Sequence, residues 1–239
     1  MRTATLLSLL ALAPAVAADP PKKPVYEFKK QANPQGTGKF YLGREIAPVM
    51  GYEAAGWLDR TEREKEEEPA KLIKALDLKP GMVVADVGAG SGYHCFLMSP
   101  LVGEKGKVIA CDVQPEMLDI VEARSKRKKI KNIELARGTE TDPKLPPGEV
   151  DLIIMVDVYH EFSHPYEMTE KLVEALKPGG RLVFVEFRLE DDKVPIKLVH
   201  KMSERQVIKE MAEFPILEHE KTVSSLPWQH VILFKKKAK

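Results

Sequence analysis

The stretch MVVADVGAGSG, residues 82–92, constrains the fold of this 239-residue chain more than any other part of it. Met82–Val87 is a largely apolar run rich in β-branched residues, which is the pattern of a strand buried on both faces. Glycines then follow at alternate positions, and from Tyr93 onwards the apolar residues recur with helical spacing. A strand, a glycine turn and a helix in this order build a nucleotide site at a helix N-terminus in an α/β sheet.

A second predicted strand, Lys107–Val113, carries Asp112 near its end, twenty residues after Gly92. An acid in this position is placed to accept hydrogen bonds from both hydroxyls of a ribose. A dinucleotide fingerprint would place its third glycine three residues after the second, where this chain has Tyr93. The spacing therefore disfavours a nicotinamide-dependent oxidoreductase, which we keep as an alternative.

DVGAGSG, followed by the acid in CDVQPEML, resembles the class I S-adenosylmethionine-dependent methyltransferases over roughly residues 70–235. The resemblance implies S-adenosylmethionine as the cofactor, with the glycine loop near its amino-acid part and the second-strand acid on its ribose. The loop RGTETD after the third strand matches the segment that contacts the adenine in that family. The residues expected to bind the cofactor are Asp86, Gly88, Ala89, Gly90, Gly92, Asp112, Val113, Thr139, Glu140 and Asp157.

The expected fold is α/β, a doubly wound and mostly parallel seven-stranded sheet with a C-terminal antiparallel hairpin. The run Val150–Val158 lacks alternation, so it predicts a strand buried on both faces, and we expect it next to the glycine strand. Residues 215–225 and 228–234 can form the hairpin. A reversed last strand distinguishes the methyltransferase sheet from a dinucleotide-binding fold.

The N-terminus predicts export. Arg2, a short apolar core and Pro14-Ala15-Val16-Ala17 make a secretory signal peptide over residues 1–18, cleaved near Ala17 or Ala18. The mature protein is then expected to be periplasmic or secreted, without stable membrane anchoring, since the run is too short to span a bilayer comfortably. We expect residues 19–40 to form a linker or arm, 41–80 an N-terminal helical cap segment, and 81–239 the S-adenosylmethionine-binding methyltransferase domain.

The composition limits which partners and metals are expected. There are 37 Lys and Arg against 36 Asp and Glu, a formal charge of +1, so no general attraction to nucleic acid is expected. No H-E-x-x-H or C-x-x-C spacing occurs, so no required metal is expected either. Cys95 and Cys111 are expected to be two buried thiols rather than a bridge.

The acceptor should lie beyond the strand Val150–Val158, at the segment DVYHEF. This segment differs from the Asn-Pro-Pro-Tyr type of many nucleic-acid methyltransferases. His160 is the first candidate for a general base, with Tyr159 and Glu161 orienting it or the acceptor, and His94 is the second candidate. The expected reaction is in-line methyl transfer from S-adenosylmethionine to a small-molecule or protein acceptor. An exported, non-catalytic binding protein on the same fold is the alternative, and the oligomeric state stays open.

Overall fold

The computed structural model describes residues 24–238, and its centre is a mixed sheet with the strand order β10-β11-β8-β7-β4-β5-β6. The two-residue strand β9 pairs with β8 at the side of this path. The strands from β4 to β8 run parallel, whereas β11 is antiparallel to β8 and to β10. The predicted doubly wound sheet with a C-terminal antiparallel hairpin is therefore confirmed.

The bounds of the elements follow the chain. The strands are β1 (Tyr26–Phe28), β2 (Lys39–Tyr41), β3 (Arg44–Glu45), β4 (Val83–Val87), β5 (Lys107–Asp112), β6 (Ile133–Arg137), β7 (Val150–Val156), β8 (Leu176–Arg188), β9 (Lys201–Met202), β10 (Leu217–Val223) and β11 (Gln229–Lys236). The α-helices are α1 (Ala55–Leu58), α2 (Arg63–Glu66), α3 (Pro69–Ala75), α4 (Tyr93–Val102), α5 (Pro115–Lys128), α6 (Pro165–Ala175) and α7 (Glu204–Met211). Short 3-10 helices are η1 (Tyr52–Ala54), η2 (Tyr159–Glu161) and η3 (Leu198–His200).

The glycine strand β4 lies between β5 and β7, as predicted. The chain reaches β5 and β6 on one side of β4 and crosses back to β7 on the other. This reversal of strand order opens a crevice beyond the carboxyl ends of β4 and β7, where ligands bind in open α/β sheets. The topology thus places the glycine turn, the end of β5 and the end of β7 together.

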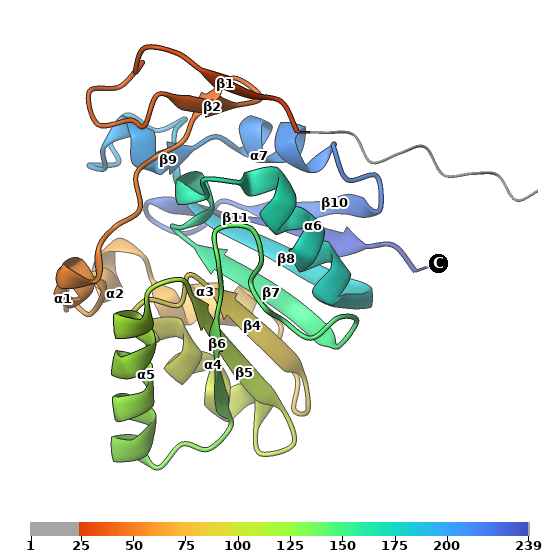
Figure 1. Ribbon diagram of the computed structural model, residues 1–239. Coiled ribbons are helices and arrows are strands. Elements are labelled where there is room, and N and C mark those ends of the chain that lie inside the picture. Colours follow the sequence, from red (N-terminus) through yellow and green to blue (C-terminus); the bar gives the residue numbers. More distant parts are fainter. Residues whose placement is uncertain (1–23, 239) are drawn as a thin grey trace, which may run out of the picture.

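Helices cover both faces of the sheet. Alternate residues of each buried strand point to opposite sides, so each strand contributes apolar side chains to both faces. Val84 packs in one hydrophobic cluster with Met98 of α4 and Leu72 of α3. Ala85 belongs to a second cluster, with Leu172 of α6 and Met211 of α7. Figure 1 shows α6 in front of the sheet and α3 and α4 behind it. The two packed faces explain why the parallel strands read as continuous apolar runs.

The predicted arm and cap fold differently from expectation. Residues 26–45 form a three-stranded antiparallel sheet, β1-β2-β3, which lies at the top of Figure 1 beside α7. The Glu45 carboxylate organises the loop of this sheet by accepting hydrogen bonds from the backbone N–H groups of Ala32, Asn33 and Gly38. Such side-chain ties leave no hydrophobic period in the sequence, which is why a linker was expected. The helical part of the cap begins only at η1.

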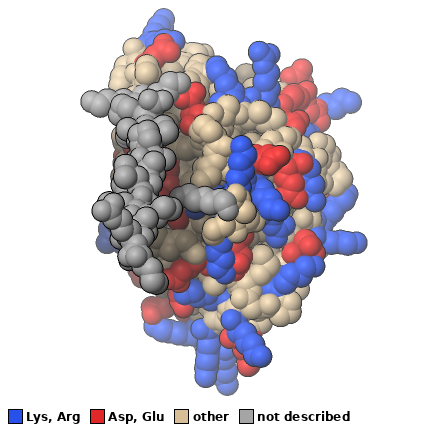
Figure 2. All heavy atoms as spheres, turned by 90° about the vertical axis from the view of Figure 1, so that its right-hand side faces the viewer, with Lys and Arg blue, Asp and Glu red and all other residues tan. Residues whose placement is uncertain are grey.

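The surface carries charges of both signs. On the face shown in Figure 2, Lys and Arg side chains are interspersed with Asp and Glu. Within residues 24–238 no helix combines the length and apolar character that crossing a bilayer requires. The predicted signal peptide, residues 1–18, lies outside the described residues.

Candidate functional site

A cavity of about 510 Å³ lies beyond the carboxyl ends of β4, β5 and β7. This volume is within the usual range for sites that enclose a small-molecule ligand. Its outer wall comes from the segment before β4, through Pro48, Val49, Met50, Trp57 and Leu58.

Two glycines of the predicted turn, Gly88 and Gly90, line this cavity. Both have positive φ, +74° and +53°, and a Cβ on either would meet a side chain at 2.4 Å or 2.5 Å. The N–H groups of Gly88 and Ala89 donate to the Cys111 carbonyl, which ties the turn to the end of β5. Gly92 caps α4, and a Cβ there would meet Val121 at 2.9 Å. Gly92 and the buried Ala89 therefore serve packing rather than the cavity wall.

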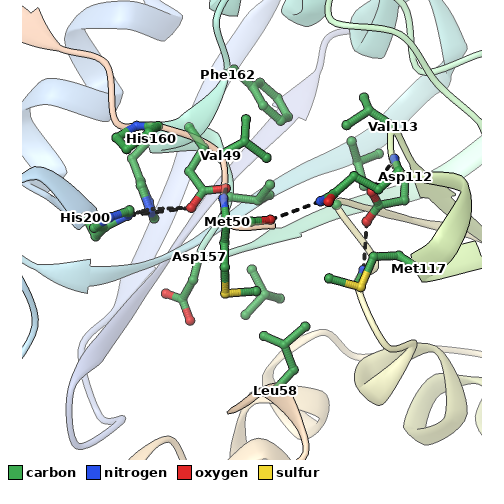
Figure 3. Close-up of a pocket in the computed structure, with 18 of the residues that line it drawn as sticks. Val49, Met50, Leu58, Asp112, Val113, Met117, Asp157, His160, Phe162 and His200 are labelled. Carbon is green, nitrogen blue, oxygen red and sulfur yellow. Dashed lines mark hydrogen bonds and ion pairs between the residues drawn. The ribbon is translucent and has the colours of Figure 1, made fainter. Parts of the chain in front are cut away.

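Asp112 lies where the sequence predicted an acid for the ribose. One carboxylate oxygen accepts the N–H of Gly90 at 2.9 Å, and the other accepts the N–H of Gln114 at 3.0 Å. Burial raises the pKa of Asp112 in spite of these bonds. Figure 3 shows Asp112 and Val113 at one end of the cavity. Both N–H bonds fix the carboxylate at the cavity wall, where it can accept further donors.

Asp86 is placed differently from expectation. Its side chain is buried below the turn, accepts a hydrogen bond from the Cys95 thiol at 3.2 Å, and is not among the residues that line the cavity. Burial raises its pKa to about 6. The direct contact with cofactor that we expected of Asp86 is therefore not supported. Cys95 and Cys111 are both free and buried, as predicted.

The remaining cofactor candidates line the cavity. Thr139 and Glu140 lie in the loop after β6, next to Gly138, and Asp157 follows β7. Asp157 has a positive φ of 51°. One carboxylate oxygen of Asp157 accepts from Gln229 at 2.6 Å, while Oδ1 is buried and has no hydrogen-bond partner within residues 24–238. Burial, and then the charges of nearby Glu67 and Glu186, raise the pKa of Asp157 well above its ordinary value.

The other end of the cavity holds His160 and Glu161, both buried on η2. His160 Nδ1 contacts Glu186 Oε2 at 2.6 Å, and His160 Nε2 contacts His200 Nδ1 at 3.1 Å. Burial opposes protonation of His160, but the charge and hydrogen bond of Glu186 outweigh it, so the pKa of His160 is raised. Figure 3 shows His160 and His200 side by side at the end opposite Asp112.

Two other catalytic candidates are placed away from the cavity wall. The Tyr159 hydroxyl donates to Glu210 Oε2 at 2.8 Å within the core, so Tyr159 is not placed to orient an acceptor. His94 is buried on α4, where burial holds its pKa well below the ordinary value. The prediction of direct catalytic roles for these two side chains is not supported by their positions.

Sequence reasoning missed Glu186, His200 and Arg63. Glu186 lies two residues before the end of β8, so an acid near a strand end was an available signal. His200 offered none, because the residues before it lack a regular period. Arg63 lines the cavity and pairs with Glu67 at 2.6 Å, both nearly fully buried. Their i,i+4 spacing in an acidic run is also the spacing of a solvated helix face, so the sequence does not distinguish a buried pair from an exposed one.

The sheet with its reversed final hairpin, and a cavity where a glycine turn meets an acid on the next strand, define the class I methyltransferase architecture. The chain belongs to this family: a model described as "Methyltransferase domain" matches residues 78–232. A solved S-adenosylmethionine-dependent methyltransferase from Aquifex aeolicus is 29% identical, with a TM-score of 0.74 over 79% of this chain and 100% of that one.

Curated relatives match a shorter region. A protein-L-isoaspartate O-methyltransferase from Pyrococcus horikoshii is 34% identical over 114 residues, 48% of this chain and 48% of the relative. A demethylmenaquinone methyltransferase from Lactococcus lactis is 31% identical over 117 residues, 49% of this chain and 46% of the relative. The chain thus spans about half the length of the curated relatives it matches.

S-adenosylmethionine is the cofactor of this family, and the cavity fits it. Asp112 offers a carboxylate for the ribose hydroxyls, and the apolar side chains of Val113 and Met117 line the adjoining wall. The unpartnered Asp157 Oδ1 suits a cationic donor such as the cofactor's ammonium group, because a buried acceptor without a donor is costly. Gly88 and Gly90 line the same cavity, where a Cβ would collide with the Val158 or the Leu58 side chain.

Proposed function

We propose that this protein transfers a methyl group from S-adenosylmethionine to a small-molecule or protein acceptor that presents a hydroxyl or a thiol. The observation that best supports this proposal is that one cavity has a candidate cofactor-binding acid at one end and a candidate base at the other. Asp112 lies at the cofactor end, and the Glu186–His160 pair lies at the other.

Asp112, Asp157 and the glycine turn would hold the cofactor. When bound, the cofactor supplies an electrophilic methyl group with a neutral sulfur leaving group. The protein must then place the acceptor in line at about 3–3.5 Å and exclude water. The apolar wall around Met50 and Phe162 suits the exclusion of water.

His160 would take the acceptor's proton. Glu186 is fully buried and holds the Nδ1 side of the ring at 2.6 Å, so Nε2 is the nitrogen left on the His200 side, where it can accept a proton. Glu186 acts as a positioning residue that fixes the ring and supports its positive charge. Glu161 is held by the Met50 N–H at 3.2 Å.

The charges at this end favour a neutral protic acceptor. Glu161 and Glu186 flank the His160 ring, and a carboxylate acceptor would have to approach these two acids. We therefore favour a hydroxyl or thiol acceptor over an isoaspartyl carboxylate, which the name of the Pyrococcus relative suggests and which serves as the competing acceptor in the test.

Export is part of the proposal. The signal-peptide pattern of residues 1–18 supports a periplasmic or secreted enzyme, with no nucleic-acid partner and no stable membrane anchor. Fractionation of cells that express the full chain, with the N-terminal residue of the recovered protein determined, tests the cleavage near Ala17.

The function is tested with methyl-labelled S-adenosylmethionine and a panel of phenols, alcohols, thiols and an isoaspartyl peptide. His160→Gln should lower turnover by about 100-fold or more, the usual contribution of a general base, with S-adenosylhomocysteine affinity preserved. His219→Gln, an exposed histidine on β10, is the matched control. Unchanged turnover in His160→Gln would remove His160 from the mechanism, and labelling of only the isoaspartyl peptide would overturn the acceptor class.

A further inference from the structure

Three ligand atoms of metal-binding type converge at the acceptor end of the cavity. They are His160 Nε2, His200 Nδ1 and Glu161 Oε1. The two nitrogens are 3.1 Å apart, and the carboxylate oxygen is 3.9 Å from His160 Nε2 and 3.6 Å from His200 Nδ1. Each of these three residues also lines the cavity.

These separations match a first coordination shell. Zinc lies about 2.0–2.2 Å from nitrogen and oxygen ligands, so a tetrahedral site places neighbouring donor atoms about 3.3–3.5 Å apart. The three separations bracket this value. Small rotations of the side chains would therefore suffice to bring all three atoms onto one ion.

The surrounding contacts orient the three donors. Glu186 contacts His160 Nδ1 at 2.6 Å, which is the carboxylate–histidine arrangement that supports metal ligands and turns the other ring nitrogen toward the ion. The Met50 N–H holds one oxygen of Glu161 at 3.2 Å, which leaves Oε1 to face the two rings. His200 ends η3, and its backbone N–H donates to the carbonyl of Lys197, the residue that precedes η3.

Charge favours a cation here. Glu161 and Glu186 are 8% and 0% exposed, and Asp157 follows β7 close enough for its charge to couple with Glu186. Arg44 is one neighbouring cation, and its guanidinium is paired with Glu210 at 2.8 Å; Lys197 and Arg63 also line the cavity, and Arg63 is paired with Glu67. Buried carboxylates are costly unless they are paired or coordinate a metal, and an ion between the two histidines would offset them.

We propose that His160, His200 and Glu161 bind one divalent transition-metal ion, of the Zn²⁺ class, with an open coordination position toward the cavity. Two histidines, one carboxylate and an open position are the donor set of catalytic rather than closed structural zinc sites. The sequence concealed the site because His160 and His200 are forty positions apart and come from two different 3-10 helices. The proposal departs from the expectation, drawn from local spacing, that no metal is required.

This inference deepens the proposed function and rests on it only for the position of the acceptor. His160 takes the acceptor's proton in the metal-free protein, whereas in the metal-loaded protein its Nε2 binds the ion and the ion activates the acceptor instead. The acceptor oxygen or sulfur would occupy the open position, where the ion lowers its pKa so that its proton passes to water. The bond from sulfur to the methyl carbon then breaks as the bond from the acceptor atom forms.

Metal binding is measured without turnover. The purified full chain is stripped with a chelator and titrated with Zn²⁺ in a calorimeter and with Co²⁺ by visible absorption, where a tetrahedral site gives intense d–d bands. We expect one ion per chain. His200→Ala and Glu161→Gln should each weaken Zn²⁺ binding at least tenfold, and His219→Ala should leave it unchanged.

Cofactor binding is the second readout. His200→Ala should keep its affinity for S-adenosylhomocysteine, which shows that the variant is folded, while Asp112→Ala should lose that affinity and keep the ion. His200→Gln repeats the test if the alanine variant is unstable. Less than half an ion per chain, or Zn²⁺ binding that survives in both His200 variants, would overturn the site. If the ion binds and no acceptor is methylated, the metal site stands and the proposed activity fails.

Discussion

Replacing Asp112 by Ala tests the cofactor end of the cavity most directly. The carboxylate is 7% exposed and already accepts two backbone N–H groups, at 2.9 Å and 3.0 Å. If it also accepts two ribose hydroxyls, each bond to the charged group contributes about 1.5–3 kcal/mol, so at least about 3 kcal/mol of binding is lost. That loss weakens the affinity for S-adenosylhomocysteine by about two orders of magnitude.

Calorimetry with S-adenosylhomocysteine measures this change, and thermal unfolding measures the accompanying loss of stability. The Gly90 N–H loses its acceptor in the variant, so the free energy of unfolding should fall by about 1–3 kcal/mol. Asp119→Ala removes an exposed carboxylate from α5 and is the control for net charge. An affinity change below about threefold, less than about 0.7 kcal/mol, would refute the assignment of Asp112 to the ribose.

Three further substitutions test the fold around the site. Gly88→Ala combines a φ of +74° with a side-chain overlap at 2.4 Å, whereas Gly148→Ala has a φ of +70° in open space. The first should therefore destabilise the protein by about 1–3 kcal/mol more than the second in denaturant unfolding, and equal effects would contradict the packing argument. Burial raises the pKa of Asp86 from 3.8 to about 6. The folded protein therefore holds this proton more tightly than the unfolded chain, and the free energy of unfolding falls as the pH rises from about 4 to about 6. Asp86→Asn should gain stability relative to the wild type over this window, approaching about 3 kcal/mol above pH 6, and a difference independent of pH would show that Asp86 does not titrate there. Arg44→Met should cost about 3–5 kcal/mol, because it leaves Glu210, 0% exposed, as an unpaired buried charge. Removing that charge as well, in Arg44→Met with Glu210→Leu, should restore most of the loss, and no recovery would refute the charge argument.

The sequence predicted which elements meet at the cofactor end of the cavity, because the signals for those elements are local. The strand, turn and helix of residues 83–102 are contiguous, and Asp112 follows at a fixed interval. Each glycine has a backbone conformation or a close neighbour that leaves little alternative to it. Asp86 belongs to the same motif but does not line the cavity. Successive residues of a strand point to opposite faces of the sheet. The Asp86 side chain points to the face covered by α4, where it contacts Cys95.

The N-terminal region was predicted less well, because long-range contacts decide its structure. Tyr26 donates to Glu167 at 2.5 Å, and Arg44 reaches Glu210 across the sequence. A short strand such as β1 is marginal alone, and its partners cannot be inferred from hydrophobic period. Arg63 and Glu67 show the same limit, since a buried ion pair and a solvated one have the same spacing.

The acceptor end differs from the cofactor end in how it is assembled. His160 comes from the loop after β7, Glu186 from β8 and His200 from η3, and none of the three lies within a shared motif. Glu186 accepts both the Tyr159 N–H at 3.1 Å and the His160 ring at 2.6 Å, so one buried carboxylate sets the position of η2 relative to β8. That carboxylate has no exposure, so a positive charge on the His160 ring, or on a cation bound beyond the ring, would offset the cost of burying it. Glu186 does not line the cavity, yet through the His160 ring it favours a positive charge, either a proton or a metal ion, next to the methyl acceptor.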